Sequence, residues 1–313
     1  GNYADLETRG FELSVAWQDV INFKKPLSYN LKFTLADNVS RITKYYNPGN
    51  LIIVEPYTFV ANYYEGQRVG DIWGYTTEGI FTSEDDIKNH ADQSAIQVSS
   101  GNKLMPGDIK FKDLNNDGFI NKGNKTLDDH GDWSVIGNNR PRYMYGITAN
   151  LNWNNFSLDL FLQGVGKRDW YFNTTEFWGQ YSVWYGIIPE HIMDDNWTVN
   201  GGNPDSYWPR YRGPMVYGDR QLQAQTKYLQ NVSYLRLKNI SLAYSIPEQI
   251  ISKAGISNLQ FYVAAQNIWT YSPLYKIAQG IDVETLDFEG GQRYNNNNYP
   301  VLKTITLGLN LTF

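Results

Sequence analysis

Residues 143–163, YMYGITANLNWNNFSLDLFLQ, carry the pattern that decides the fold. Apolar side chains stand at every second position from Tyr143 to Trp153, and the same alternation resumes from Phe156 to Leu162. Successive side chains of a β-strand point to opposite faces of the sheet, so each segment predicts a strand with one apolar and one polar face. Only Asn154 and Asn155 separate the two segments, and Asn suits a tight two-residue turn. The stretch therefore predicts an antiparallel hairpin.

The same period-2 alternation recurs in five further segments, which brings the number of predicted strands to seven: residues 11–18, 27–35, 239–246, 259–266 and 304–313. Several are longer than the usual soluble strand of about 5–6 residues and approach the roughly 9–11 of a membrane strand. Trp17, Trp153 and Trp269 stand at strand ends, as in the aromatic girdle of a membrane barrel. The apolar row that ends at Phe313 suits a strand that closes a barrel. The pattern predicts an all-β fold, a transmembrane antiparallel β-barrel.

The predicted connections are sharply unequal in length. Three are short, namely Asn22–Pro26, Asn154–Asn155 and Pro247–Ser257, and three are long, namely 38–141, 167–232 and 270–299. If Phe313 ends on the periplasmic side, alternation of strand direction places every short connection there and every long loop outside. Outer-membrane barrels have this asymmetry. The alternative is a secreted, soluble β-sandwich that binds carbohydrate, in which the apolar face is the core and no such parity is required.

Composition limits the classes of function. The chain has 313 residues with a net charge of −5 and no basic block, so nucleic-acid binding is not expected. It has no cysteine, which excludes disulfides and thiolate metal sites within it. No run approaches the roughly 20 apolar residues of a membrane helix, but alternating barrel strands do not need one. The chain starts at Gly1 without a signal peptide, and we expect it to be a fragment or a processed product.

Five segments resemble, in the expected order, segments of SusC/RagA-type TonB-dependent transporters. They are RGFEL at 9–13, GDIKFKDLNNDGFI at 107–120, YLRLKNISLAYSIP at 234–247, AQNIW at 265–269, and the closing YPVLK at 299–303 with GLNLTF at 308–313. The resemblance implies that residues 1–313 are the C-terminal part of a barrel of about 22 strands with long extracellular loops. The family's N-terminal plug and its TonB-contacting segment are not in this sequence.

The resemblance also implies a cellular role. It implies the outer membrane of a Gram-negative bacterium of the Bacteroidetes type, where membrane lipid surrounds the barrel. It implies TonB-dependent uptake of oligosaccharides or peptides. The implied partners are a SusD-like surface lipoprotein that acts as a lid and the TonB complex, which the N-terminal part would contact.

One loop has the beginning of a calcium-binding motif. Residues 113–121, DLNNDGFIN, place carboxylate and amide oxygens at alternate positions, with a glycine that permits a sharp turn. The candidate ligands of a structural Ca²⁺ are Asp113, Asn115, Asp117 and the Phe119 carbonyl, with Asp128 or Asp129 to complete the set. The glutamate that completes an EF-hand loop is missing, since Asn124 stands at that position. A plain turn held by side chain-to-backbone hydrogen bonds is the alternative.

The second long loop is dense in aromatic residues. Flat rings stack on sugars and also anchor protein interfaces, so this loop is a candidate contact surface for cargo or lid. The residues are Trp178, Tyr181, Trp184, Tyr185, Trp197, Tyr207 and Trp208. The alternative is that the rings pack against one another within the loop.

Nothing in the sequence predicts catalysis or a catalytic cofactor. Asp194 with Asp195, and Glu284 with Asp287 and Glu289, have the residue types of a glycosidase pair, but sequence spacing fixes no distance between carboxylates. The three histidines, His90, His130 and His191, have no second ligand at metal spacing and no nucleophile motif nearby.

Overall fold

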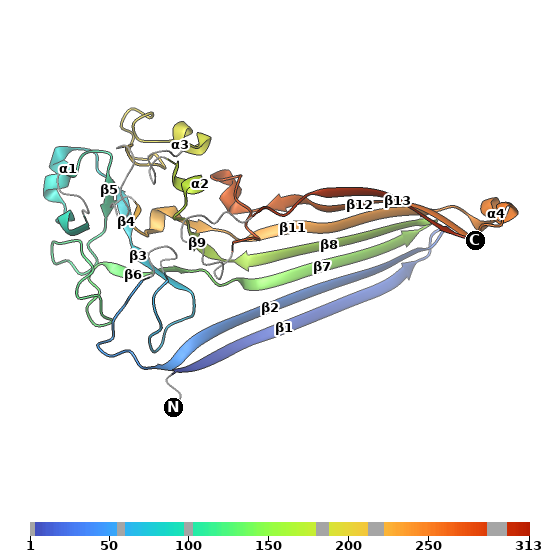
Figure 1. Ribbon diagram of the computed structural model, residues 1–313, viewed down its shortest axis with the longest axis horizontal. Helices are drawn as coiled ribbons and strands as arrows, with labels where there is room; N and C mark the ends of the chain where they lie inside the picture. Colours follow the sequence, from blue (N-terminus) through green and yellow to red (C-terminus); the bar gives the residue numbers. More distant parts are fainter. Residues whose placement is uncertain (1–3, 55–59, 97–102, 180–187, 212–221, 287–298) are drawn as a thin grey trace.

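The computed structural model describes residues 4–54, 60–96, 103–179, 188–211, 222–286 and 299–313. A long antiparallel sheet and a compact group of loops at one end of it make up the molecule (Figure 1). The sheet has seven strands in the order β1-β2-β7-β8-β11-β12-β13. Their bounds are β1 Ala4–Ile21, β2 Leu27–Tyr45, β7 Arg142–Trp153, β8 Phe156–Lys167, β11 Tyr234–Ser245, β12 Asn258–Tyr271 and β13 Thr304–Thr312. All seven predicted strands are confirmed.

Cross-strand pairing sorts the side chains of this sheet onto two faces. One register row joins Val15, Phe33, Ile147, Leu162, Leu237 and Trp269. The adjacent row joins Ser14, Thr34, Gly146, Gln163, Arg236 and Thr270. We call the side of the first row the apolar face and the side of the second row the polar face.

A β-bulge keeps the faces consistent along β11. The register against β8 shifts between Leu237 and Asn239, so Lys238 is an extra residue. Leu237 and Ile240 are three positions apart, so strict alternation through Lys238 would put them on opposite faces. With the bulge, Leu237 pairs with Leu162 and Ile240 pairs with Leu160, and all four lie on the apolar face.

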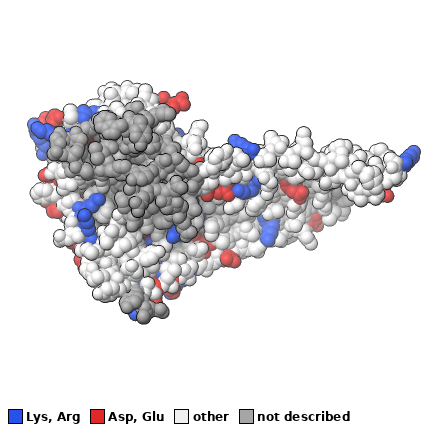
Figure 2. All heavy atoms as spheres, viewed as in Figure 1, with Lys and Arg blue, Asp and Glu red and all other residues white. Residues whose placement is uncertain are grey.

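The apolar face carries exposed side chains, unlike the inner face of the β-sandwich alternative. Val15 is 53% exposed, Trp269 is 48% exposed and Leu307 is 78% exposed. A sandwich would bury such a row against a second sheet. Figure 2 shows that uncharged side chains dominate the visible surface of the extended sheet. No helix within the described residues is long and apolar enough to cross a membrane.

The two ends of the sheet differ in the length of their connections, as the alternation of strand direction predicted. The short connections, including α4 (Glu248–Ile251) and the 3₁₀ turn Ser252–Ala254, lie at the end where the C-terminus lies (Figure 1). The long connections gather at the opposite end. The first of them was predicted too long, because β2 continues to Tyr45 rather than ending before residue 38. Asp37 interrupts the apolar pattern there but is paired with Arg142, so the strand continues through it.

The long connections contain small elements of their own. Three two-stranded sheets form: β3 (Asp71–Tyr75) with β6 (Trp133–Asn138), β4 (Thr77–Ile80) with β5 (Ile109–Phe111), and β9 (Asp169–Tyr171) with β10 (Leu229–Asn231). The helices are α1 (Glu84–Asn89), α2 (Thr175–Trp178) and α3 (Glu190–Asp194), with 3₁₀ turns at Ser94–Ile96, Thr226–Tyr228 and Pro273–Lys276. Most of the buried apolar side chains belong to this loop end. We call it the loop core.

Candidate functional site

The three long connections bind one another through their backbones and side chains. The Tyr75 amide donates to the Ala224 carbonyl at 2.8 Å, which joins the first connection to the second. Arg168, at the start of the second, donates to the Leu286 carbonyl of the third at 2.7 Å. The loop core is therefore one packed unit that sits on the ends of the barrel strands.

A cluster of stacked rings forms the centre of the loop core. Trp208 stacks on Tyr228 with ring centroids 5.2 Å apart and planes 12° apart. Trp178 meets the Tyr228 ring edge-on at 4.8 Å. The polar atoms of these rings are satisfied, since the Trp178 indole donates to the Phe172 carbonyl at 2.7 Å and the Trp208 indole donates to the His191 carbonyl at 3.0 Å. Each aromatic pair contributes about 0.5–1.5 kcal/mol of stability beyond the contribution of the surface area that it buries.

Burial divides the seven aromatic candidates. Trp178 is fully buried and Trp208 is 1% exposed, so neither offers a ring face to cargo or lid, and self-packing describes both. Trp197 and Tyr207 are half-buried and keep some accessible surface. Tyr181, Trp184 and Tyr185 lie outside the described residues. Contact with cargo or lid therefore stays a prediction for five residues: Tyr181, Trp184, Tyr185, Trp197 and Tyr207.

Two glycines seat the Trp197 ring. A Cβ on Gly107 would lie 2.8 Å from the ring, and a Cβ on Gly202 would lie 3.3 Å from it. Both glycines have positive φ, +93° and +88°, which other residues rarely adopt. The indole nitrogen of Trp197 is buried without a hydrogen-bond acceptor among the described residues. The sequence offered no signal for this arrangement, because the two glycines are far apart in the chain.

The acidic loop is held by its own side chains. Asp113 accepts the amides of Asn116 at 2.7 Å and Gly118 at 2.9 Å, and Asp117 accepts the Phe119 amide at 2.8 Å. Hydrogen bonds of this kind, from backbone amides to side chains, are those expected if the loop is a plain turn and not a calcium site. Asp132, fully buried, accepts the amides of Leu114 at 2.7 Å and Asn121 at 2.9 Å, so one carboxylate holds both ends of the loop. Sequence reasoning missed Asp132 because it lies 11 residues beyond the motif's last residue.

The structure does not bring all five metal candidates together. No group of three or more His, Cys, Asp or Glu side chains within the described part of the chain is arranged to hold a metal ion. Asp128 therefore does not join Asp113 and Asp117, and it accepts a hydrogen bond from Asn50 at 3.4 Å instead. A site built on Asp113, Asn115, Asp117 and the Phe119 carbonyl stays a prediction.

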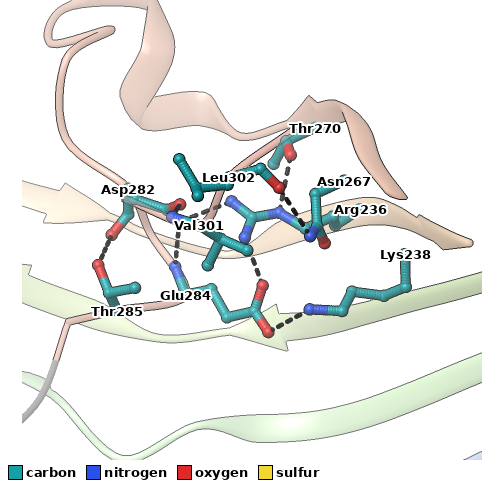
Figure 3. A network of polar contacts seen from close by, with 9 residues as sticks. All are labelled: Arg236, Lys238, Asn267, Thr270, Asp282, Glu284, Thr285, Val301 and Leu302. Carbon is teal, nitrogen blue, oxygen red and sulfur yellow. Dashed lines mark hydrogen bonds and ion pairs between the residues drawn. The ribbon is translucent and has the colours of Figure 1, made fainter. Parts of the chain in front are cut away.

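A buried ionic network fastens the third long connection to the sheet (Figure 3). Arg236 of β11 pairs with Asp282 at 2.6 Å and with Glu284, and Lys238 pairs with Glu284 at 2.8 Å. Asp282 also accepts the Val301 amide at 3.0 Å, so it ties down the returning end of the same connection. Burial raises the pKa of the Asp282 carboxyl, but hydrogen bonds from Arg236 and from backbone amides outweigh burial, and the net pKa is lowered. Glu284, considered above as half of a glycosidase pair, is thus engaged in ion pairs.

The first long connection bears a polar hollow of about 680 Å³. Lys110 lies in it between Glu78 at 3.2 Å and Asp86 at 3.0 Å. The side chain of His90 is 7% exposed and lies 3.4 Å from Glu78. Charges of both signs surround the hollow, which suits a ligand with several polar groups better than a simple anion or cation.

Amide and carboxylate side chains follow the polar face of the sheet below the loop core. Asn150 donates to Asp159 at 2.6 Å, and Asn310 donates to Gln260 at 3.0 Å. Lys32 pairs across the sheet with Thr148, and Thr148 pairs with Phe161. A polar surface of this kind, opposite a mainly apolar one, is typical of a barrel wall that separates lipid from a watery lumen.

Known proteins share this arrangement. The chain is 26% identical over 327 residues to TonB-dependent receptor P3 of Formosa agariphila, covering all of this chain and 29% of the relative. It is 27% identical over 337 residues to TonB-dependent receptor P26 of the same organism, covering 30% of that relative. Among solved structures, the RagAB peptide transporter matches with a TM-score of 0.64 at 20% identity, over 99% of this chain and 30% of that chain. No protein-family model matches the chain.

The chain is thus similar in sequence to TonB-dependent receptors and similar in fold to the RagAB peptide transporter. The RagAB peptide importer in its open-open state matches as well, with a TM-score of 0.61 at 18% identity. The chain spans 29–30% of the length of the curated relatives named above. Both structural matches cover 99% of this chain, so they include the seven-stranded sheet and the loop core.

Proposed function

We propose that the chain forms wall strands and outward loops of an outer-membrane importer driven by TonB. The observation that carries the proposal is the two-faced sheet: an exposed apolar row on one side, a polar row on the other, short turns at one end and a packed loop core at the other. The sequence relatives are named TonB-dependent receptors, which supports the same role. In the full protein a plug and a TonB-contacting segment would be supplied by chain outside this sequence.

The cargo is an oligosaccharide or a peptide. A matched solved structure is titled as a peptide transporter, which favours a peptide, whereas the accessible rings of Trp197 and Tyr207 suit either sugar or peptide. The polar hollow around Lys110 offers donors and acceptors to both. We propose that a SusD-like surface lipoprotein covers the loop core and encloses the cargo.

Uptake by whole cells tests this proposal. Cells that express the full transporter should accumulate a labelled oligosaccharide mixture or a labelled peptide mixture, and deletion of TonB should abolish the uptake. The native protein should be extracted only by detergent and should migrate on gels with heat-dependent mobility, because closed barrels resist unfolding. A full-length protein that stays monodisperse in plain buffer would contradict the assignment.

A structural calcium ion in the acidic loop is a separate proposal. Asp113, Asn115 and Asp117 present oxygen atoms within one short loop, and Ca²⁺ takes oxygen ligands at about 2.3–2.6 Å. Anomalous scattering from crystals grown with millimolar calcium tests it. A peak within reach of these oxygens supports the ion, and an empty map at that position refutes it.

A further inference from the structure

A shallow groove of about 910 Å³ lies at the short-turn end of the sheet. Its wall is almost entirely apolar and includes Phe23, Leu27, Leu151, Trp153, Phe156 and Leu158. Phe23 is 62% exposed and Trp153 is 49% exposed, so these rings are uncovered. Three neighbouring strands, β2, β7 and β8, supply the wall, and none of them is at the edge of the sheet.

Register places this groove on the apolar face. Leu27 pairs with Trp153, and Trp153 pairs with Phe156, which gives one row across three strands. Leu151 pairs with Leu158 in the next row on the same face. Two residues of a strand rise about 7 Å, so the groove runs from the turn along the wall over the length of several methylene groups.

Two lysines stand at the mouth of this groove. Lys24 and Lys25 belong to the turn between β1 and β2, and both are exposed. The Lys25 ammonium donates to the side-chain carbonyl of Asn154, which fixes it beside the neighbouring turn. The Lys24 ammonium makes no hydrogen bond or ion pair with any residue that the structure describes.

We infer that the groove binds an anionic phospholipid, with its phosphate at Lys24 and Lys25 and an acyl chain along Trp153, Leu151 and Leu158. The inference rests on the proposed function, which makes the apolar face the lipid face and the short turns the periplasmic rim. A phospholipid has a negative head beside an apolar tail, and the groove has two positive side chains beside an apolar wall. Trp at this level matches the interfacial position of aromatic side chains in membranes. Basic pockets at the membrane surface recognise anionic headgroups in this way.

Native mass spectrometry of the full transporter in detergent, with phosphatidylglycerol added, tests the site. The wild type should retain phosphatidylglycerol in preference to phosphatidylcholine. Each lysine contributes about fivefold to the affinity for an anionic lipid surface, so Lys24→Gln should weaken retention about fivefold, and Lys24→Gln with Lys25→Gln should weaken it by more than tenfold. Lys253→Gln is the matched control, because Lys253 lies in another short turn outside the groove and is also exposed.

Three outcomes overturn the site. Retention that is unchanged in the double variant overturns it, and so does an equal loss in Lys253→Gln, which would indicate only a general attraction between charges. Glycerol phosphate, which has the head without the chains, should not displace the lipid at equal concentration, and displacement would show that the apolar wall takes no part. The double variant should fold and import as the wild type does. Normal import with unchanged lipid retention refutes the site alone. Uptake by wild-type cells that is no greater than uptake by cells lacking the protein refutes the proposed function.

Discussion

Asp132 is the residue on which the acidic loop depends. Its two carboxylate oxygens each accept one backbone amide, from Leu114 and from Asn121, in a fully buried position. Asp132→Asn puts an amide NH₂ group against one of those donors and leaves a buried N–H unsatisfied, which costs about 1–3 kcal/mol. We expect hydrogen exchange of residues 113–121 to accelerate by one to two orders of magnitude. Asp117→Asn is the control, because Asp117 is exposed and its substitution should accelerate exchange less. Equal exchange rates of residues 113–121 in both variants would contradict the role of Asp132.

Lys122 gives the loop core a dependence on pH. Its ammonium lies 4.1 Å from the centre of the Trp133 ring, and burial, with a smaller contribution from nearby Lys125, lowers its pKa to about 8. In the unfolded chain the pKa is about 10.5, so between pH 8 and 10.5 the unfolded state binds more protons than the folded state. The stability of the loop core should therefore rise as pH increases through this window and stay level below it.

Hydrogen exchange of the β6 amides at pH 7.5 and pH 9.5, corrected for the intrinsic rate, measures this dependence. Lys122→Met should remove it, whereas Lys88→Met, at an exposed site on α1, should leave it unchanged. A slope that survives Lys122→Met would show that another group is responsible.

At the scale of elements, Arg236 connects a strand to a loop. Its side chain is 4% exposed and its partner Asp282 is 7% exposed, so removal of the cation leaves buried carboxylate charge. Breaking a buried pair in this way costs about 3–5 kcal/mol. Arg236→Met should release residues 273–286 to proteolysis in folded protein while the sheet stays intact. Arg9→Met is the control, because the pair of Arg9 with Glu7 is exposed and contributes little. Resistance of Arg236→Met to protease would show that aromatic packing alone holds the connection.

The seven long strands were predictable from the sequence, and the loop elements were not. Alternation of the kind seen from Tyr145 to Trp153 is a local signal, so it survives without knowledge of the partner strand. β2 was predicted too short because Asp37 ends the apolar pattern, and its partner Arg142 lies 105 residues away. The burial of Trp178 and Trp208 follows from contacts with Tyr228, and the network around Arg236 depends on residues about 46–48 positions along the chain. Such long-range pairings leave no periodic trace in the sequence.

At the scale of the whole molecule, the apolar side chains are distributed in two ways. In the sheet they form exposed rows, and in the loop core they are buried in an ordinary packed interior. A soluble protein would bury both sets. The two sets are explained together if the sheet is embedded in lipid and the loop core stands in water beyond it. We predict that the short-turn end, where the C-terminus lies (Figure 1), faces the periplasm.

Cysteine labelling on intact cells tests this arrangement most directly. The chain has no cysteine of its own, so Asn203→Cys in the loop core and Lys253→Cys in a short turn can each be read singly in a full transporter without other accessible thiols. Both positions are exposed in the structure. A maleimide that does not cross the outer membrane should label Asn203→Cys, with the lid lipoprotein deleted to avoid shielding, and should label Lys253→Cys only after the cells are permeabilised. Labelling of Lys253→Cys on intact cells with silence at Asn203→Cys would contradict the orientation, and labelling of both would contradict the membrane barrel itself.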